Sequence, residues 1–354
     1  MKILTVIGAR PQFVKASVVS KAIREQSNLS EIIVHTGQHF DSNMSDVFFE
    51  QLGIPKPNYQ LDINGGTHGV MTGRMLAEIE NVILQEKPDR VMVYGDTNST
   101  LAGALAASKL HVPTAHVEAG LRSFNMRMPE EINRILTDQV SDILFCPTQT
   151  AIDNLISEGF EQKACKMLNV GDVMQDSALF FAQRATEPLG LTLQDGFILV
   201  TLHRAENTDD PVRLASIIDA LNEIQSTIAP VVLPLHPRTR NVIEKLGLKL
   251  NVKIIDPVGY LEMLWLLERS SLILTDSGGV QKEAFFFRKP CVTMRDQTEW
   301  VELVTCGANV LVGADYESIV KATREGLGKL ILDDGLLYGG GQASSRIAEH
   351  LSKL

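Results

Sequence analysis

Three acidic residues stand where an acid or a base could act on a bound ligand. Asp96 and Glu118 each directly follow an apolar run that is typical of a buried strand. Glu130 follows a proline that suits the first turn of a helix. Asp96 alone could be a helix cap, and either glutamate alone could be structural. Together they predict a cluster, because carboxylates gathered at one edge of a sheet raise one another's pKa and can exchange protons with a substrate.

Positively charged residues follow other apolar runs and could bind an anion. Arg10 and Lys15 come after the first run, near the start of a helical segment whose N-terminus adds its own positive end. His203 with Arg204, and also His236, follow two runs in the second half of the chain. Taken singly, each would also fit a solvated basic loop or a structural histidine. Their repetition at strand ends predicts a local basic patch, which an acidic chain needs in order to hold an anionic ligand.

Residues 275–284 (Thr-Asp-Ser-Gly-Gly-Val-Gln-Lys-Glu-Ala) have the composition of a phosphate-binding turn. Ser277, Gly278 and Gly279 would present backbone N–H groups and the positive end of a helix dipole to a diphosphate. Glu283, one turn into the helix, could accept hydrogen bonds from both hydroxyls of a ribose. A nucleoside diphosphate is therefore predicted here. The sequence has neither G-x-G-x-x-G nor a Walker A motif, so a nicotinamide cofactor or a P-loop is not predicted.

These residues must be positioned by alternating strands and helices. Short apolar runs predict buried parallel strands, and amphipathic segments such as residues 71–86 predict the helices between them. The predicted strands span residues 2–7, 31–35, 90–95, 113–117, 142–146, 197–202, 230–235, 252–255, 272–275, 290–294 and 308–312. Repeated strand–helix units predict an α/β fold with two Rossmann-like, doubly wound sheets. In such sheets ligands bind beyond the carboxyl ends of the strands.

A segment that contains proline and glycine, residues 186–196, predicts a boundary between two domains. We expect residues 1–185 to form an N-terminal Rossmann-like domain that carries the acid and base groups. Residues 186–340 are expected to form a C-terminal Rossmann-like domain that binds the nucleotide. A helix within residues 341–354 is expected to pack back on the first domain. The length of 354 residues suits two such cores.

Composition argues against several other classes of function. The net charge of −10 disfavours nucleic acid or an anionic membrane as the partner. No apolar stretch reaches the roughly 18 residues of a membrane span, and the first residues lack the pattern of a signal peptide, so a cytoplasmic protein is expected. The four cysteines form no C-x-x-C pair, so neither a metal nor a redox dithiol is predicted.

In this order and at this spacing, the motifs resemble those of the non-hydrolysing UDP-N-acetylglucosamine 2-epimerase family. The resemblance runs from residue 1 to about residue 350 and rests on GARPQFVK, YGDTNST, HVEAGLRS, MPEEINR, TLHRAEN, LTDSGGVQKEA, MRDQTE and YGGGQASSRI. It implies two Rossmann-like domains that face a cleft, as in GT-B glycosyltransferases, and usually a homodimer. It also implies a UDP-sugar substrate whose UDP is a tethered leaving group, with no cofactor.

The resemblance assigns roles to individual positions. The family's catalytic groups are matched by Asp96, Glu118, Glu130, His203 and Lys15. Its substrate-binding and UDP-binding positions are matched by Arg10, Ser277, Gly278, Gly279, Glu283, His236 and Arg295, and Arg204 belongs to the predicted basic patch.

The whole chain resembles most the subgroup that acts on UDP-2,3-diacetamido-2,3-dideoxy-glucuronate and gives the mannuronate epimer for O-antigen synthesis. Arg127, just before the Pro-Glu-Glu turn, is then a candidate partner for the C6 carboxylate. Phe40-Asp41 differ from the polar or basic residues of members that bind a second UDP-N-acetylglucosamine as activator. UDP-N-acetylglucosamine as the substrate, a GT-B glycosyltransferase and a non-catalytic nucleotide-sugar sensor stay open as alternatives.

The predicted mechanism follows from the low acidity of the C2 proton, which has no carbonyl beside it. Inverting C2 requires either transient oxidation or departure of the group at C1, and the missing dinucleotide motif argues against oxidation. If UDP leaves, positive charge at C1 acidifies the C2 proton and a carboxylate can remove it. A 2-acetamidoglycal forms, and reprotonation on the opposite face with return of UDP completes the inversion.

Overall fold

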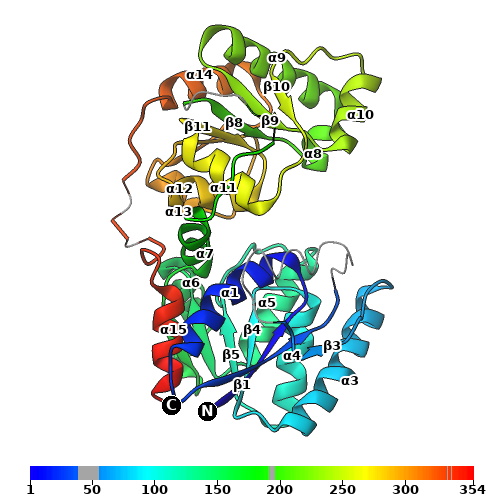
Figure 1. Cartoon of the computed structure of the whole chain (residues 1–354), viewed down its shortest axis with the longest axis vertical. Helices are drawn as coiled ribbons and strands as arrows, with labels where there is room; N and C mark the ends of the chain where they lie inside the picture. The colour runs from blue at the N-terminus through cyan, green and yellow to red at the C-terminus, as the bar shows by residue number, and fades with distance from the viewer. Residues whose placement is uncertain (39–55, 190, 192–195, 333, 336) are drawn as a thin grey trace. The chain divides into compact units, whose positions relative to one another are not determined.

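A computed structural model describes residues 1–38, 56–189, 191, 196–332, 334–335 and 337–354 (Figure 1). Two compact units are present: the first comprises Met1–Ser177 and Gly335–Leu354, and the second comprises Ala178–Asp334. The limits predicted from the sequence lie at 185/186 and 340/341. In the structure the first limit lies between Ser177 and Ala178, inside helix α7 (Val173–Ala182). One continuous helix therefore connects the two units, and the segment with proline and glycine follows it within the second unit. Phe40-Asp41 lie outside the described residues.

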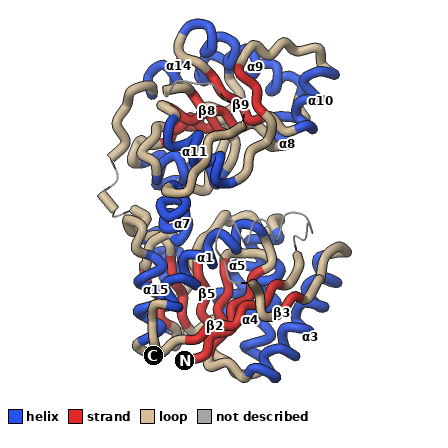
Figure 2. The backbone as a smooth tube through the Cα atoms, viewed as in Figure 1, coloured by secondary structure: helices blue, strands red, loops and turns tan. Residues whose placement is uncertain are grey.

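The first unit is a seven-stranded parallel sheet covered by helices, with strand order β3-β2-β1-β4-β5-β6-β7 (Figure 2). Its strands are β1 (Lys2–Ile7), β2 (Ser30–His35), β3 (Tyr59–Gln60), β4 (Arg90–Tyr94), β5 (Thr114–Val117), β6 (Ile143–Cys146) and β7 (Lys166–Asn169). Its helices are α1 (Arg10–Arg24), α3 (His68–Glu86), α4 (Asn98–Lys109), α5 (Pro129–Val140), α6 (Gln149–Ser157), the 3-10 turn η1 (Phe160–Gln162) and α15 (Ala343–Ser352). Helix α15 packs against α1, so both ends of the chain belong to this unit.

The second unit is a six-stranded parallel sheet with strand order β10-β9-β8-β11-β12-β13. Its strands are β8 (Ile198–Thr201), β9 (Val231–Pro234), β10 (Lys253–Ile255), β11 (Leu272–Thr275), β12 (Cys291–Thr293) and β13 (Asn309–Leu311). Its helices are α8 (Ala205–Thr208), α9 (Pro211–Thr227), α10 (Pro237–Lys245), α11 (Tyr260–Arg269), α12 (Gly278–Phe286), α13 (Val301–Thr305) and α14 (Tyr316–Gly326). Leu214, Ile217, Leu221 and Ile224 of α9, which recur at helical spacing, are buried in its core.

Both sheets are doubly wound, which confirms the predicted fold class. The strand order reverses between β1 and β4 in the first sheet, and between β8 and β11 in the second. At such a point the loops that follow the two strands diverge to opposite faces of the sheet and leave a crevice where ligands bind. The loops after β4, β8 and β11 contain Asp96, His203, Arg204 and Ser277, and the helices after β1 and β11 begin with Arg10 and Gly278.

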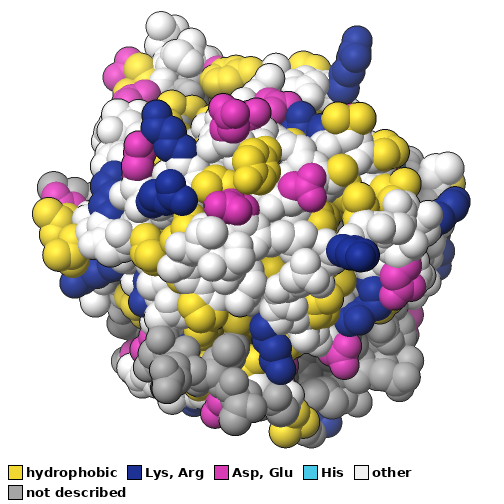
Figure 3. Space-filling view, turned by 90° about the horizontal axis from the view of Figure 1, so that it is seen from above, with side chains coloured by type: hydrophobic (Ala, Val, Ile, Leu, Met, Phe, Trp, Pro, Cys, Tyr) yellow, Lys and Arg dark blue, Asp and Glu magenta, His cyan; other side chains and the backbone are white. Residues whose placement is uncertain are grey.

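The described surface is that of a chain with mixed charges. On the face drawn in Figure 3, Lys and Arg side chains are interspersed with Asp and Glu side chains and with apolar ones. None of the helices in the described ranges is both long enough and apolar enough to span a membrane.

Candidate functional site

Lys15 and Glu118 form an ion pair beside the switch point of the first sheet. Lys15 lies in α1, after β1, and Glu118 directly follows β5. Both side chains are largely buried, with 13% and 6% of their surface exposed. A Cβ atom on Gly95, which follows β4, would lie 3.4 Å from Glu118 Oε2 and 3.8 Å from Lys15 Nζ. The structure therefore brings both residues together next to the turn that carries Asp96.

The backbone of Glu118 adopts a conformation that side chains other than glycine rarely take. Its φ is +69°, and two residues later Gly120 has a φ of +79°. A left-handed glutamate costs free energy unless its surroundings hold it in place, and such residues concentrate at functional sites. The left-handed backbone of the turn after β5 therefore restricts the direction in which the Glu118 side chain points.

Asp96 is paired with an arginine from helix α5. Arg134 donates to Asp96 Oδ2 from Nε at 3.0 Å and from Nη2 at 2.8 Å. Its Nη1 donates to Glu131 at 2.6 Å, and Asn133 Nδ2 donates to the Asp96 backbone oxygen at 2.8 Å. Two consecutive residues of helix α5, Asn133 and Arg134, thus hold Asp96 through three hydrogen bonds. No role was predicted for either residue from the sequence.

Of the two adjacent glutamates at the start of α5, Glu131 is bound to the protein and Glu130 is exposed. The Glu131 carboxylate accepts hydrogen bonds from the N–H groups of Ser123 and Phe124. Burial alone would raise the pKa of Glu131, but these bonds and Arg134 hold it below its usual value. Glu131 therefore fixes the 123–124 turn, whereas Glu130 is accessible to a ligand.

Two predicted cations of the first unit are less defined than Lys15. Arg127 is exposed, and its backbone N–H donates to Asn125 Oδ1 at 3.1 Å. Arg10 is the first residue of α1, and its side chain lies outside the described part of the chain. Among the described residues, Arg127 forms no ion pair with a carboxylate.

Gln12 ties the turn after β1 to the turn after β4. Its Oε1 accepts from the backbone N–H groups of Gly8 and Ala9 at 2.8 and 3.0 Å. Its Nε2 donates to the Tyr94 backbone oxygen at 2.6 Å. Gln12 is 2% exposed, so this amide is a fixed internal bridge. It was noted in the sequence only as part of a motif, because its partner lies in a distant segment.

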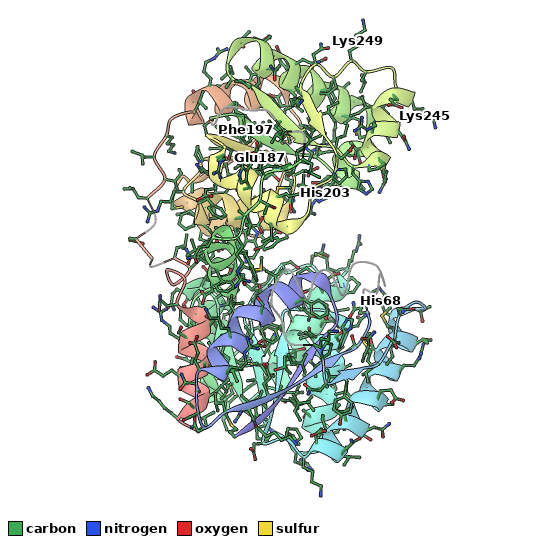
Figure 4. The ribbon with its side chains drawn as sticks, in the orientation of Figure 1. His68, Glu187, Phe197, His203, Lys245 and Lys249 are labelled. Carbon is green, nitrogen blue, oxygen red and sulfur yellow. The ribbon has the colours of Figure 1, made fainter. Side chains whose placement is uncertain are left out.

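The switch point of the second sheet contains a buried aspartate that organises the predicted basic residues. Asp276 is fully buried and accepts from the N–H groups of His203 and Arg204 at 3.0 and 2.9 Å. Its Oδ1 also lies 3.2 Å from His203 Nδ1. Burial would raise the pKa of Asp276, but the hydrogen bonds from His203 and Arg204 lower it below its usual value. Asp276 thus orients the ring of His203, which is labelled in Figure 4, while 55% of the His203 side chain stays exposed.

The serine–glycine turn forms the start of α12, as predicted. Ser277 is the N-cap residue, and its side chain makes no capping hydrogen bond to the described residues. A Cβ atom on Gly278 would overlap the Glu299 carboxylate and lie 3.6 Å from Arg204 Nη2. Arg295 Nη1 donates to Glu299 Oε2 at 2.9 Å. The Glu299 carboxylate therefore lies nearest the helix start and is paired with Arg295, while Arg204 lies beside it; an anion bound here would take the place of Glu299 next to these two arginines.

A pocket of about 200 Å³ lies next to this turn in the second unit. It is lined by Thr201, Leu202, His203, Pro234, His236, Pro257, Val258, Met263, Ser277 and Val280. Its apolar walls and few polar groups suit a flat, partly polar ring such as a nucleobase. His236, at the N-cap of α10, contributes one of the polar groups, and its Nδ1 accepts from Arg238 N–H at 3.3 Å.

Glu283 lies one turn into α12 and is 8% exposed. Burial raises the pKa of this carboxyl group to about 7, and the nearby Lys282 only partly offsets the effect. The hydroxyl of Tyr260, also buried and near Glu283, has no hydrogen-bond partner among the described residues. A ligand with adjacent hydroxyls could supply the donors that would stabilise the ionised Glu283.

Together the two switch points provide complementary chemistry. The first offers two carboxylates, Asp96 and Glu118, each paired with a cation, and a lysine, which can remove and return protons and stabilise negative charge. The second offers a helix start, two arginines, a histidine and a small apolar pocket, which suit a nucleoside diphosphate. Among the described residues, no group of three His, Cys, Asp or Glu side chains could hold a metal ion.

Comparisons with known proteins agree on one family. Residues 21–352 match the family described as UDP-N-acetylglucosamine 2-epimerase. The chain is 83% identical over 354 residues, and 100% of both chains, to the UDP-2,3-diacetamido-2,3-dideoxy-D-glucuronate 2-epimerase of Pseudomonas aeruginosa. It is 35% identical to the UDP-N-acetylglucosamine 2-epimerase of Escherichia coli K12 over 99% of this chain and 98% of the other.

Solved structures show the same likeness. The UDP-GlcNAc 2-epimerase of Methanocaldococcus jannaschii, in complex with UDP-GlcNAc and UDP, is 44% identical and superposes with a TM-score of 0.84 over the whole of both chains. The UDP-GlcNAc 2-epimerase of Neisseria meningitidis, bound to UDP-GlcNAc, is 31% identical with a TM-score of 0.83, again over both whole chains.

Proposed function

Because the chain belongs to the UDP-N-acetylglucosamine 2-epimerase family, we propose that it is a cytoplasmic, cofactor-independent isomerase that acts on UDP-2,3-diacetamido-2,3-dideoxy-D-glucuronate. It inverts C2 and gives the mannuronate epimer, a precursor for an O-antigen polysaccharide. The observation that carries this substrate is the likeness, along the entire chain, to the Pseudomonas aeruginosa enzyme that is named for it.

The proposed reaction begins with loss of UDP. The bond between C1 and the β-phosphate oxygen breaks, and its electron pair leaves with UDP. A carboxylate of the first unit takes the C2 proton, and the C–H electrons form the C1=C2 bond of a 2-acetamidoglycal. A proton is then delivered to the other face of C2 while a UDP oxygen attacks C1, so no net oxidation occurs. Asp96, Glu118 and Glu130 supply the acid and base groups.

Negative charge develops on the β-phosphate of UDP while the C1–O bond breaks, and this charge must be stabilised. We assign this to the start of α12, to Arg204 and to His203 in the second unit, and to Lys15 in the first. Fixed dipoles and cations aimed at a developing anion supply a large share of catalysis because they need no reorganisation during the reaction. Asp276 contributes by holding the 203–204 turn in place.

Proton exchange with solvent tests the proposed function. The chain is incubated in D₂O without added cofactor, with the diacetamido-glucuronate in one sample and UDP-N-acetylglucosamine in another, and C2 is followed by NMR. We expect deuterium at C2 and the mannuronate epimer from the first substrate, at a rate well above that from the second. The reverse preference would transfer the assignment to UDP-N-acetylglucosamine. Binding with no exchange from either sugar would instead fit a glycosyltransferase or a sensor.

The raised pKa of Glu283 predicts that nucleoside binding strengthens as the pH rises. A ribose whose two hydroxyls donate to Glu283 binds the ionised form, and with a pKa of about 7 that form is the minority at pH 6 and the majority at pH 8. Uridine is the suitable probe because, unlike UDP, it has no group that titrates in this range. Its affinity, measured by calorimetry, should rise about tenfold between pH 6 and pH 8.

The matched variant is Glu283→Gln, which cannot ionise. Uridine affinity in this variant should be nearly constant over the same range. A wild-type protein with equal affinity at both pH values would remove Glu283 from the ribose site.

We also propose that the chain forms a homodimer through the outer face of α5 and the segment before it. Phe124 is 77% exposed, and Met128, Ile132 and Leu136, at four-residue steps, are 37%, 40% and 42% exposed. The opposite face of α5 bears the polar residues that contact the 96 and 123–124 turns. An apolar strip on the outside of a helix whose inner face is already occupied suits a second copy of the same chain.

Sedimentation equilibrium tests the dimer. The wild-type chain should have twice the mass of one chain, and Ile132→Asp should dissociate it into monomers. Val212→Asp, which replaces an apolar residue that is 79% exposed in the second unit, is the control and should stay dimeric. A monomeric wild type, or an Ile132→Asp variant that dimerises as tightly as the control, would contradict the proposal.

A further inference from the structure

Four charged side chains of the first unit are linked by direct hydrogen bonds, of which His116, Asp138 and Arg122 are buried and Glu158 lies at the surface. His116, in β5, is fully buried, and its Nδ1 lies 2.6 Å from Asp138 Oδ1. Asp138, in α5, accepts from Arg122 Nη1 at 2.8 Å through its other oxygen. Arg122 in turn donates from Nε and Nη2 to both carboxylate oxygens of Glu158, at 2.7 and 2.8 Å. None of these four residues was assigned a role from the sequence.

The partners of His116 define which of its ring nitrogens carry protons. Its Nε2 lies 2.7 Å from the backbone oxygen of Gly95, and a carbonyl oxygen only accepts hydrogen bonds. Nε2 is therefore a donor. The Nδ1 atom faces Asp138, whose Oδ2 already accepts from Arg122 and from the Gly120 N–H at 3.2 Å, as an ionised carboxylate does. Both ring nitrogens of His116 thus point at acceptors.

The signs of the four groups alternate when His116 is an imidazolium. A positive His116, a negative Asp138, a positive Arg122 and a negative Glu158 sum to zero. Each buried ion then touches an opposite charge and donates or accepts in a direct hydrogen bond, which is the condition under which buried charges are tolerated.

The chain of charges contacts both turns that carry proposed catalytic carboxylates. Gly95, whose oxygen accepts from His116, directly precedes Asp96. Gly120, whose N–H donates to Asp138, closes the left-handed turn that begins at Glu118. The spacing between Asp96 and Glu118 is therefore set through His116 and Asp138, in addition to the β4–β5 pairing.

We propose that His116 is a positioning residue that donates from both ring nitrogens, to Asp138 and to the Gly95 carbonyl, and through the latter holds Asp96 in register with Glu118. The catalytic part of this inference rests on the proposed function, whereas the protonation state does not. Because His116 is fully buried, its proposed role is to position Asp96 and not to react with the substrate.

Nitrogen NMR of the chain labelled with ¹⁵N-histidine tests the protonation state. The His116 resonances are identified as those lost in His116→Gln. Both ring nitrogens should show directly bonded hydrogens and imidazolium shifts at pH 7. A His116 Nδ1 that carries no hydrogen at pH 7 would overturn the proposal.

Two isosteric variants separate the two hydrogen bonds. In His116→Gln the amide nitrogen takes the place of Nε2 and keeps the bond to Gly95, whereas in His116→Asn it takes the place of Nδ1 and keeps only the bond to Asp138. We expect kcat to fall about 10²-fold in the Asn variant, because small misplacements of reacting groups have effects of that size. In the Gln variant it should fall less than tenfold, and KM should change little in either.

Hydrogen exchange of residues 95–98, measured by mass spectrometry, provides a readout that does not depend on activity. These amides should exchange faster in His116→Asn than in the wild type, and close to the wild-type rate in His116→Gln. Equal exchange and equal kcat in the two variants would show that His116 has a merely structural role. An inactive wild-type chain would refute the proposed function, and the NMR and exchange results would still decide the role of His116.

Discussion

Replacing Glu118 by glutamine is expected to lower kcat by about 10³-fold, within the range observed for loss of an acid or base group. Glutamine keeps the shape of the side chain but cannot take a proton, and it cannot form an ion pair with Lys15. UDP affinity should stay within a few-fold of the wild type, because the proposed UDP site lies in the other unit. The measurements are steady-state kinetics of C2 inversion and calorimetric titration with UDP.

A carboxylate far from the proposed chemistry provides the control for this variant. Glu25 follows α1 at the end opposite Arg10 and is exposed, so Glu25→Gln makes the same change of charge without touching the acid cluster. It should leave kcat unchanged. If Glu118→Gln lost UDP affinity in proportion to its loss of activity, Glu118 would have a structural role and another carboxylate would have to remove the C2 proton.

Asp276→Asn is expected to lower both the stability of the second unit and its affinity for UDP. Both oxygens of Asp276 accept hydrogen bonds, and an asparagine has only one acceptor, so its NH₂ group must face the backbone donors of His203 or Arg204. A buried donor without an acceptor costs about 1–3 kcal/mol in the free energy of unfolding. Because the 203–204 turn loses its anchor, UDP affinity should fall by at least about tenfold, which corresponds to roughly 1.4 kcal/mol.

Thermal unfolding and UDP titration of the same preparations measure both effects. Asp209→Asn is the matched control, since Asp209 is 52% exposed, forms an ion pair with the exposed Arg238 and accepts only one further hydrogen bond among the described residues, from Thr208 Oγ1 at 3.3 Å. An Asp276→Asn protein with wild-type UDP affinity would show that His203 and Arg204 do not depend on this carboxylate.

The fold was predictable because buried parallel strands leave a clear pattern in the sequence. Every apolar run that predicted a strand overlaps one in the structure. The two strands that were not predicted, β3 and β7, are the edges of the first sheet. β3 has only two residues, and β7 is exposed at both ends, so neither forms an apolar run. Edge strands that are solvated on one side lack the signal on which the prediction depends.

The candidate site was predictable at the level of strand ends and not at the level of partners. The strand ends predicted that Asp96, Glu118 and Glu130 converge on one crevice. The structure brings the turns of Asp96 and Glu118 together, with Lys15 beside Glu118, and leaves Glu130 exposed at the start of α5. The partners of the site residues come from elsewhere: Arg134 and Asp138 reach the turns from α5, and Gln12 from α1. Such pairs depend on how a helix lies over the sheet, and a single sequence does not contain that information.

Adjacent glutamates illustrate the same limit. Glu130 and Glu131 are chemically identical in the sequence, and only the fold distinguishes them. The structure gives Glu131 hydrogen-bonded partners on the inner side of α5 and leaves Glu130 exposed. The role predicted for Glu130 stays a prediction, and Glu130→Gln beside Glu131→Gln would separate a chemical effect on kcat from a loss of stability.

The claim that UDP departs during the reaction can be followed through the oxygen that links C1 to the β-phosphate. The diacetamido-glucuronate substrate is prepared with ¹⁸O in that bridge and incubated with the chain, and the label is followed by ³¹P NMR. If the C1–O bond breaks and UDP returns, ¹⁸O must appear in the non-bridging positions of the β-phosphate as the mannuronate epimer accumulates. Epimer formed with all of its ¹⁸O still in the bridge would contradict the account.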